Sequence, residues 1–286
     1  MTRLMKRLFV LIAGFALASA AHAQAPSDVL IEVNRARTEG IFSSTPVFQR
    51  AILIKPEVPS DTALLVFKGA PGYARIESLK DKMLRGNVPN FIRPHLRLFM
   101  QAGIAIVLMD CPTDQWGVQQ FIPTNCLDNY RMSRQHADDV RSVMAALKQD
   151  HGYAKFYLIG HSAGSISSRW LAKNLGNEIA GSIHSASINA ERKPGTPWYS
   201  GVGFPYKDIA APVLHLHHEN DGCTYTQHRV TQGYAGANLT TVRGGNPTTT
   251  DPCALHYHSY ESREEAASTA IIHWIKTGKV EPVVGE

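Results

Sequence analysis

The sequence predicts an α/β protein with a mostly parallel central sheet and helices on both of its faces. Two observations support this class. Short apolar runs alternate with longer helical patterns after residue 45, and the run Ile104 to Met109 has no polar alternation, which is typical of a strand covered on both sides. The chain has 286 residues, enough for one large domain with a full core.

The expected strands are short apolar runs bounded by turn residues. Residues Pro56 to Pro59 form the turn between the first two of them. Strands are expected at residues 47–54, 62–67, 104–109, 155–159, 179–185 and 213–217.

The expected helices lie between these strands, and each has the spacing of one apolar face. The last helix shows this best, because Ala267, Ala270, Ile271, Trp274 and Ile275 form a single stripe. Residues 244–252, which include a run of threonines, are expected to form a loop. Helices are expected at residues 91–101, 133–149, 165–175 and 263–276.

The first 23 residues have the pattern of a secretory signal peptide. Three basic residues between positions 3 and 7 precede an uncharged apolar run from Leu8 to Ala21, and an Ala-His-Ala cleavage pattern ends at Ala23. The run is too short to span a bilayer comfortably, so a membrane anchor is the weaker interpretation. We expect cleavage after Ala23, a single domain over residues 24–286, and a periplasmic or secreted protein without a stable membrane anchor.

The charge balance argues against a nucleic-acid partner. The full chain holds 29 basic and 24 acidic residues, and the leader contains three of the bases and no acid. The mature chain therefore has 26 basic against 24 acidic residues, a net charge of +2. It contains no basic block of the kind that binds nucleic acid.

Four cysteines follow the leader, at positions 111, 126, 223 and 253. An even number in an exported protein predicts disulfides, and four cysteines allow three pairings. Zinc bound through cysteine is the competing interpretation, but the chain has no C-x-x-C pair.

The pentapeptide from Gly160 to Gly164 has the pattern G-x-S-x-G and carries the most information in the chain. An apolar strand pattern precedes it and a helical pattern follows it, so Ser162 would sit on a tight strand-to-helix turn with its side chain exposed at the carboxyl edge of the sheet. Glycine at both ends of the motif would relieve crowding in that turn. The alternative is an ordinary helix-capping serine.

With this motif the mature chain resembles the α/β-hydrolase superfamily, in its secreted, serine esterase or lipase-like branch. The resemblance implies an α/β-hydrolase fold and assigns Ser162 as the nucleophile of a catalytic triad. The acid should follow the strand at residues 213–217, where Asp221 matches the family position and Glu219 is the runner-up. The competing interpretation of Asp221 is a turn aspartate, because Asn-Asp-Gly is common in turns.

The triad base should lie just before the last helix. The resemblance favours His258, which a small residue and an aromatic follow, with His256 as the alternative base. If Asp221 and His258 bond to one another, their loops meet and bring Cys223 close to Cys253. Cys111 would then pair with Cys126.

The resemblance also implies an oxyanion hole made of two backbone N–H groups. Ala163, directly after the nucleophile, should supply one, and Ala70 the other. The usual family element at the second place is His-Gly, whereas this chain has Lys68-Gly69. The competing interpretation is an ordinary glycine turn after a strand.

The expected activity is hydrolysis of a small-molecule carboxylic ester through an acyl-enzyme, without a metal or other cofactor. Thioester, lactone and amide substrates fit the same triad. A metallohydrolase that binds its metal through strand and loop residues is a weaker alternative; the residues concerned are His215, His217, His218, Asp221 and His258. The competing interpretation is that His215 and His217 are core histidines with hydrogen-bond partners. A non-catalytic binding protein of the same fold is the third class.

Two irregular stretches could shape the substrate pocket. Residues 186–211 are too few for a large cap domain and contain four aromatic residues, with Pro205 between two of them. Residues 111–131 contain Trp116 and Phe121. These side chains could line an acyl pocket or simply pack the loops, and the sequence favours neither. The residues concerned are Trp116, Phe121, Trp198, Tyr199, Phe204, Pro205 and Tyr206.

Overall fold

The computed structural model describes residues 28–40, 42–76, 88–119, 122–190 and 203–286. The expected signal peptide lies outside the described residues, as do Phe121, Trp198 and Tyr199. No helix among the described residues is both long enough and apolar enough to cross a membrane.

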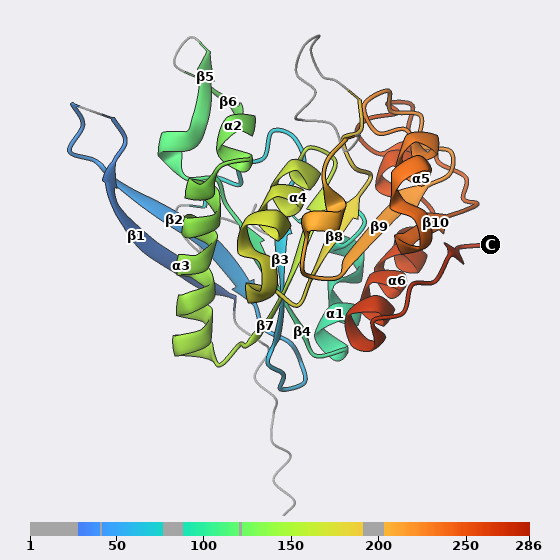
Figure 1. Cartoon of the computed structure of the whole chain (residues 1–286), viewed down its shortest axis with the longest axis horizontal. Helices are drawn as coiled ribbons and strands as arrows, with labels where there is room; N and C mark the ends of the chain where they lie inside the picture. The colour runs from blue at the N-terminus through green and yellow to red at the C-terminus, as the bar shows by residue number, and fades with distance from the viewer. Residues whose placement is uncertain (1–27, 41, 77–87, 120–121, 191–202) are drawn as a thin grey trace, which may run out of the picture.

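A nine-stranded sheet runs through the molecule (Figure 1). Its strand order is β1-β2-β4-β3-β7-β8-β9-β10-β11, with β1, β2 and β4 paired antiparallel and every later pair parallel. The mostly parallel sheet predicted from the sequence is therefore confirmed. The strands are Val29–Thr38 (β1), Pro46–Ile54 (β2), Thr62–Phe67 (β3), Ile104–Met109 (β4), Lys155–His161 (β7), Gly181–Ser185 (β8), Val213–His218 (β9), Leu239–Val242 (β10) and Val283–Val284 (β11).

The helices cover both faces of this sheet. In Figure 1, α3 and α4 lie in front of the strands. Trp116–Gln119 (β5) and Ile122–Cys126 (β6) form a separate two-stranded hairpin. The helices are Leu96–Gln101 (α1), Asp128–Arg131 (α2), Arg134–His151 (α3), Gly164–Leu175 (α4), His228–Ala235 (α5) and Glu264–Thr277 (α6).

The core divides into two layers because successive side chains of a strand point to opposite faces. Leu64 and Val66 of β3 pack in the layer beneath α1 and α6, whereas Ala63 and Leu65 pack in the layer beneath α3 and α4. All six residues of β3 and all six of β4 are buried. The uninterrupted apolar run of β4 is thus explained by burial on both faces.

The structure adds strands that the sequence patterns did not predict. The strand β1 lies at the sheet edge. Glu32 and Asn34 are on its exposed face, and Arg35 and Arg37 on the other face bond to Asp139, so its apolar pattern is incomplete. The strand β10 is only four residues long. The helix expected at residues 91–101 is shorter than predicted, because a 3₁₀ turn at Arg93–His95 precedes α1.

A buried carboxylate ties the edge strand β1 to α3. Asp139 is completely buried and accepts hydrogen bonds from Arg35, Arg37 and the Tyr130 hydroxyl at 2.6 to 2.9 Å. Burial alone would raise the pKa of Asp139, but these donors outweigh it and lower the pKa below its ordinary value. The carboxylate therefore stays ionised and keeps β1 attached to α3.

Candidate active site

Ser162 lies on a sharp turn between β7 and α4. Its φ is +54°, a left-handed conformation that costs energy for a residue with a Cβ. Its backbone N–H donates to the carbonyl of Ser185 at 3.0 Å, and its own carbonyl accepts from Ser165 at 2.9 Å. These two bonds fix the strained turn between the sheet and the helix.

The two glycines of the motif leave no room for a side chain. A Cβ on Gly160 would lie 2.1 Å from the carbonyl oxygen of Gly164, and a Cβ on Gly164 would lie 2.1 Å from that of Phe67. Both contacts involve backbone atoms, which cannot move aside cheaply. Glycine at these positions is what allows α4 to pack directly against β7 and β3.

The acid and base predicted from the sequence lie together. Oδ2 of Asp221 is 3.1 Å from Nδ1 of His258, and both side chains are almost fully buried. His258 belongs to a 3₁₀ helix at His256–Ser259, and Asp221 lies in the turn that follows β9. Since an ionised carboxylate can only accept, Nδ1 carries the ring proton and Nε2 carries the lone pair.

Asp221 is held by more than His258. Its Oδ2 also accepts from the Thr226 hydroxyl at 2.8 Å and faces Nε2 of His217 at 3.0 Å, while its Oδ1 accepts from the N–H of Cys223. Burial would raise the pKa of Asp221, but the hydrogen bonds from His217 and His258 outweigh it and lower the pKa well below its ordinary value. Asp221 is therefore a carboxylate at neutral pH.

Glu219 and His256, the alternative acid and base, make their contacts away from Asp221. Glu219 forms an ion pair with Arg243 at 3.1 Å. The ring of His256 packs edge-on against Tyr257 at 4.6 Å, and no hydrogen bond to Asp221 is found among the described contacts of His256. Of the four candidates, only Asp221 and His258 meet.

The segment after β3 lies against the Ser162 side chain. A Cβ on Gly69 would be 3.3 Å from Cβ of Ser162 and 3.9 Å from its Oγ. Within the described chain, neither Ala70 nor Ala163 uses its backbone N–H in a hydrogen bond. Both N–H groups are thus left without an acceptor among the described residues, in segments that adjoin Ser162.

No protein-family model matches this chain, and no curated protein is similar to it in sequence. Solved structures are similar to it in architecture. An esterase from Pyrococcus furiosus matches with a TM-score of 0.53 at 12% identity, over 88% of this chain and 92% of that one. The 2,6-dihydroxy-pseudo-oxynicotine hydrolase matches with a TM-score of 0.55 at 14% identity, over 92% of this chain and 72% of that one. The chain has the α/β-hydrolase fold.

In this α/β-hydrolase fold, hydrogen bonds to neighbouring residues hold the loop that carries Ala70 in place. The buried carboxylate of Asp110 accepts from the backbone N–H groups of Ala74 and Ile76 at 2.6 and 2.7 Å. Burial raises the pKa of Asp110, although these N–H donors oppose the rise. The N–H of Cys126 donates to the carbonyl of Pro71 at 2.7 Å, so the hairpin of β5 and β6 supports the same loop.

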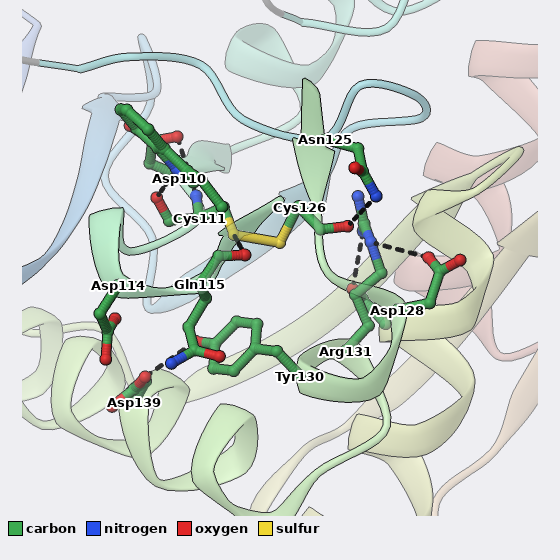
Figure 2. Close-up of a disulfide and its surroundings, with 12 residues drawn as sticks. Asp110, Cys111, Asp114, Gln115, Asn125, Cys126, Asp128, Tyr130, Arg131 and Asp139 are labelled. Carbon is green, nitrogen blue, oxygen red and sulfur yellow. Dashed lines mark hydrogen bonds and ion pairs between the residues drawn. A yellow bond between two sulfur atoms is a disulfide. The ribbon is translucent and has the colours of Figure 1, made fainter. Parts of the chain in front are cut away.

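Two disulfides flank the candidate site. Cys111 and Cys126 are joined across the loop after β4, next to Asp110 and Arg131 (Figure 2). Cys223 and Cys253 are joined with their α-carbons 4.7 Å apart. The second bond links the turn of Asp221 to the loop that leads to His258.

A pocket of about 330 Å³ opens beside Ser162. His258 lines it too, and Nε2 of His258 is buried there without a hydrogen-bond partner among the described residues. A larger pocket of about 770 Å³ surrounds the start of α6 and the C-terminal residues, but contains no member of the candidate triad. We therefore take the smaller pocket, which Ser162 and His258 line, as the candidate active site.

The aromatic side chains of the two irregular stretches pack the fold. Phe204 contacts Trp170 at 5.3 Å, Tyr206 stacks on Tyr234 at 5.2 Å, and Trp116 packs against Tyr73 at 5.3 Å. None of these three side chains lines the pocket beside Ser162. Of the two interpretations left open by the sequence, loop packing holds for these residues.

The histidines of β9 have protein partners. His215 lies edge-on to Tyr206 at 4.9 Å, and burial lowers its pKa to about 3. His217 bonds to Asp221 and Thr226, and His218 bonds to the carbonyl of Gly244. No group of three or more His, Cys, Asp or Glu residues in the described chain has the arrangement of a metal site.

Sequence reasoning missed the place of three residues at this site. His217 and Thr226 complete the shell around Asp221, and His161 forms a wall of the pocket. The position of His161 directly before Ser162 could have indicated its place. The other two are brought to Asp221 by the fold of the turn after β9, for which no local pattern exists.

Proposed function

We propose that this protein is a serine hydrolase that cleaves carboxylic esters through an acyl-enzyme intermediate. Ser162 is the nucleophile, His258 the general base and Asp221 the acid. One observation supports this above the others: His258 bonds to a buried carboxylate, its Nε2 has no partner in the described chain, and it lines the same pocket as a serine held on a strained turn.

In the first half-reaction, Oγ of Ser162 attacks the ester carbonyl carbon as its proton passes to Nε2 of His258. The carbonyl oxygen becomes an oxyanion, which the N–H groups of Ala163 and Ala70 stabilise. The tetrahedral intermediate collapses, the ester C–O bond breaks, and the alcohol leaves with the proton from His258. Water then repeats the sequence on the acyl-serine and releases the acid.

Asp221 has two tasks in this scheme. It fixes the ring orientation and the tautomer of His258, which places the lone pair on Nε2. Its negative charge then stabilises the imidazolium that forms when His258 takes the proton. The shell of His217, Thr226 and Cys223 keeps this charge in place.

Carboxylic esters are the proposed substrates, and thioesters, lactones and amides remain alternatives on the same triad. The two neighbours above are an esterase and a hydrolase by name, in keeping with this proposal. The two disulfides and the expected leader lead us to place the protein in the periplasm or outside the cell.

The deciding experiment combines activity and covalent labelling. Wild-type protein should hydrolyse a chromogenic ester and become labelled by a fluorophosphonate probe. Ser162→Ala should lose both, with turnover reduced on the order of 10⁴- to 10⁶-fold. The control is Ser165→Ala, which removes a buried serine of the same turn region and should still label.

The competing classes give different results. A metallohydrolase would lose activity in a chelator and recover with zinc, and it would not react with the probe. A binding protein would show neither turnover nor labelling. Substantial ester hydrolysis by a correctly folded Ser162→Ala protein would disprove the serine mechanism.

A further inference from the structure

His161 is the last residue of β7 and forms part of the pocket wall beside Ser162. Its ring lies between Phe91, at 5.2 Å, and the proposed base His258, at 5.0 Å. Only 7% of the residue is exposed, and the proposed mechanism assigns it no task. Its protonation pattern, however, can be worked out from its neighbours.

A chain of three buried hydrogen bonds connects His161 to the backbone. Nδ1 of His161 is 3.0 Å from Oγ of Ser185, which is 2.7 Å from the hydroxyl of Tyr260. The Tyr260 hydroxyl lies 2.8 Å from the carbonyl oxygen of Leu216. A carbonyl oxygen can only accept, so the direction of the whole chain follows from this end.

The donor and the acceptor of each of these three hydrogen bonds can be assigned. Tyr260 gives its only hydroxyl proton to Leu216, so the short contact between Tyr260 and Ser185 must be bridged by the proton of Ser185. Ser185 then has no proton left for His161, and Nδ1 of His161 must be the donor. Burial, with a smaller effect of His258, lowers the pKa of His161 well below its ordinary value, so the ring is neutral.

A neutral ring that is protonated at Nδ1 carries a lone pair at Nε2. The described residues give this atom no hydrogen-bond partner, whereas Nδ1 is bonded to Ser185. Nε2 is therefore the ring nitrogen left to meet a polar group in the pocket that His161 lines.

We propose that His161 is a specificity-determining residue, and that its Nε2 accepts a hydrogen bond from a hydroxyl group of the ester substrate. The inference rests on the proposed esterase function and names its substrate class as hydroxy esters. The hydroxyl should lie within one or two carbons of the ester group, because His161 is adjacent to Ser162 in the chain and its ring is in contact with that of His258. The hydroxyl can belong to the acyl part or to the alcohol part.

Two matched substrate pairs distinguish these sources. Ethyl 2-hydroxypropanoate against ethyl 2-methylpropanoate tests the acyl part, and 2-hydroxyethyl butanoate against propyl butanoate tests the alcohol part. In each pair a hydroxyl replaces a methyl group of similar size. The quantity to compare is the ratio of kcat/KM for the two members, because intrinsic differences in ester reactivity then cancel between protein variants.

The first pair of variants separates the two ring nitrogens. His161→Asn keeps an amide N–H near the position of Nδ1, where it can donate to Ser185, but removes the acceptor at Nε2. His161→Gln instead places an amide oxygen near the position of Nε2. The hydroxyl preference should fall roughly tenfold in His161→Asn, as expected for one lost hydrogen bond, and be partly retained in His161→Gln.

A third variant acts from outside the pocket. Tyr260 is fully buried and does not line the pocket. Tyr260→Phe removes the acceptor of the Ser185 proton, so Ser185 can donate to Nδ1 and the His161 proton can move to Nε2. The hydroxyl preference should then fall without any change of a pocket side chain, which a purely structural role of His161 would not produce.

The outcomes are distinct. A preference that falls on one substrate pair in His161→Asn and in Tyr260→Phe supports the proposal and identifies the part of the substrate that carries the hydroxyl. Equal ratios in wild type and all folded variants, on both pairs, would overturn it while leaving the esterase function intact. Failure of the wild type to cleave any of the four esters while it hydrolyses the chromogenic ester would overturn this inference alone, whereas failure on all five would overturn the proposed function as well.

Discussion

His217 places its Nε2 3.0 Å from Oδ2 of Asp221, the same oxygen that faces His258. The same Nε2 is in hydrogen-bond contact with the carbonyl of Thr226 at 2.5 Å, so it carries the ring proton and donates. His217 is thus a second buried histidine on the proposed triad acid, and it does not line the pocket beside Ser162.

We predict that His217→Leu weakens both the fold and the activity. The loss of a hydrogen bond to a charged group should lower the free energy of unfolding by about 1.5 to 3 kcal/mol. A less well held Asp221 should lower kcat/KM by roughly tenfold, which corresponds to about 1.4 kcal/mol. His217→Gln keeps a donor near the position of Nε2 and should recover much of both, as urea unfolding and ester kinetics will show.

The same variant makes a pH prediction. Asp221 has a lowered pKa in the folded state, so its contribution to stability is present above its unfolded pKa and is lost as the pH falls through the folded value. Removing the His217 donor raises that folded value toward the unfolded one, so the acid-induced loss should be smaller and should be complete at a higher pH. An equal loss of unfolding free energy in wild type and His217→Leu as the pH falls from 5 to 2 would contradict this.

The disulfide between Cys223 and Cys253 should matter for activity as well as stability. It links the turn of Asp221 to the loop before His258, and Cys253 also lines the pocket. Replacing both cysteines by serine should lower the free energy of unfolding by roughly 2 to 4 kcal/mol. It should also lower kcat/KM at a temperature where circular dichroism still shows a folded protein.

The control for this prediction is the double replacement of Cys111 and Cys126. That bond closes 15 residues of sequence rather than 30, so the loop-entropy difference is only about 0.6 kcal/mol. An unchanged kcat/KM in the folded Cys223→Ser/Cys253→Ser protein would mean that other contacts hold Asp221 against His258.

The sequence predicted the parts of the fold that local patterns encode. The apolar run of β4 and the stripe of α6 follow from burial, and the glycines around Ser162 follow from the crowding that a tight turn creates. The edge strand β1 was missed because a strand with one solvent-exposed face and several charged side chains has only a weak apolar pattern.

The candidate site likewise combines residues that local patterns predict with residues that only the folded chain brings together. Ser162, Asp221 and His258 were predicted because each stands at a fixed place relative to a strand or helix. His217 lies on β9, but its contact with Asp221 depends on how the next four residues turn back. The chain from His161 through Ser185 to Tyr260 joins two strands and a loop, and such a contact exists only in the folded protein.

Gly164→Ala should destabilise the protein although alanine favours helices. A Cβ at this first residue of α4 would lie 2.1 Å from the carbonyl oxygen of Phe67, the last residue of β3. Forcing these elements apart should cost roughly 1 to 3 kcal/mol and displace the loop that carries Ala70, with loss of activity.

Gly233→Ala in α5 is the matched control, because no atom lies within 4 Å of the Cβ it would add. Here only helix propensity acts, and it should stabilise the protein by up to about 1 kcal/mol. Thermal unfolding of both variants will show whether the signs are opposite. Two variants of the same sign would mean that α4 can move away from β3 without cost.

His136 makes the last prediction, which concerns acid stability. It is buried between Tyr130, at 4.7 Å, and Phe67, at 5.5 Å, and neither ring nitrogen has a hydrogen-bond partner in the described chain. Burial, aided by the charge of Arg131, lowers its pKa to about 3. Between pH 6.5 and that value the unfolded chain binds a proton that the folded chain cannot, so stability falls as the pH falls. The loss from this one histidine should approach about 1.4 kcal/mol for each pH unit.

His136→Phe removes the titrating group. The slope of the unfolding free energy between pH 6 and pH 4 should therefore decrease by an amount equivalent to the uptake of up to one proton. Met144→Leu, a conservative core change on the same helix, should shift the whole curve without altering its slope. Parallel curves for wild type and His136→Phe would show that His136 is protonated in the folded protein over this range.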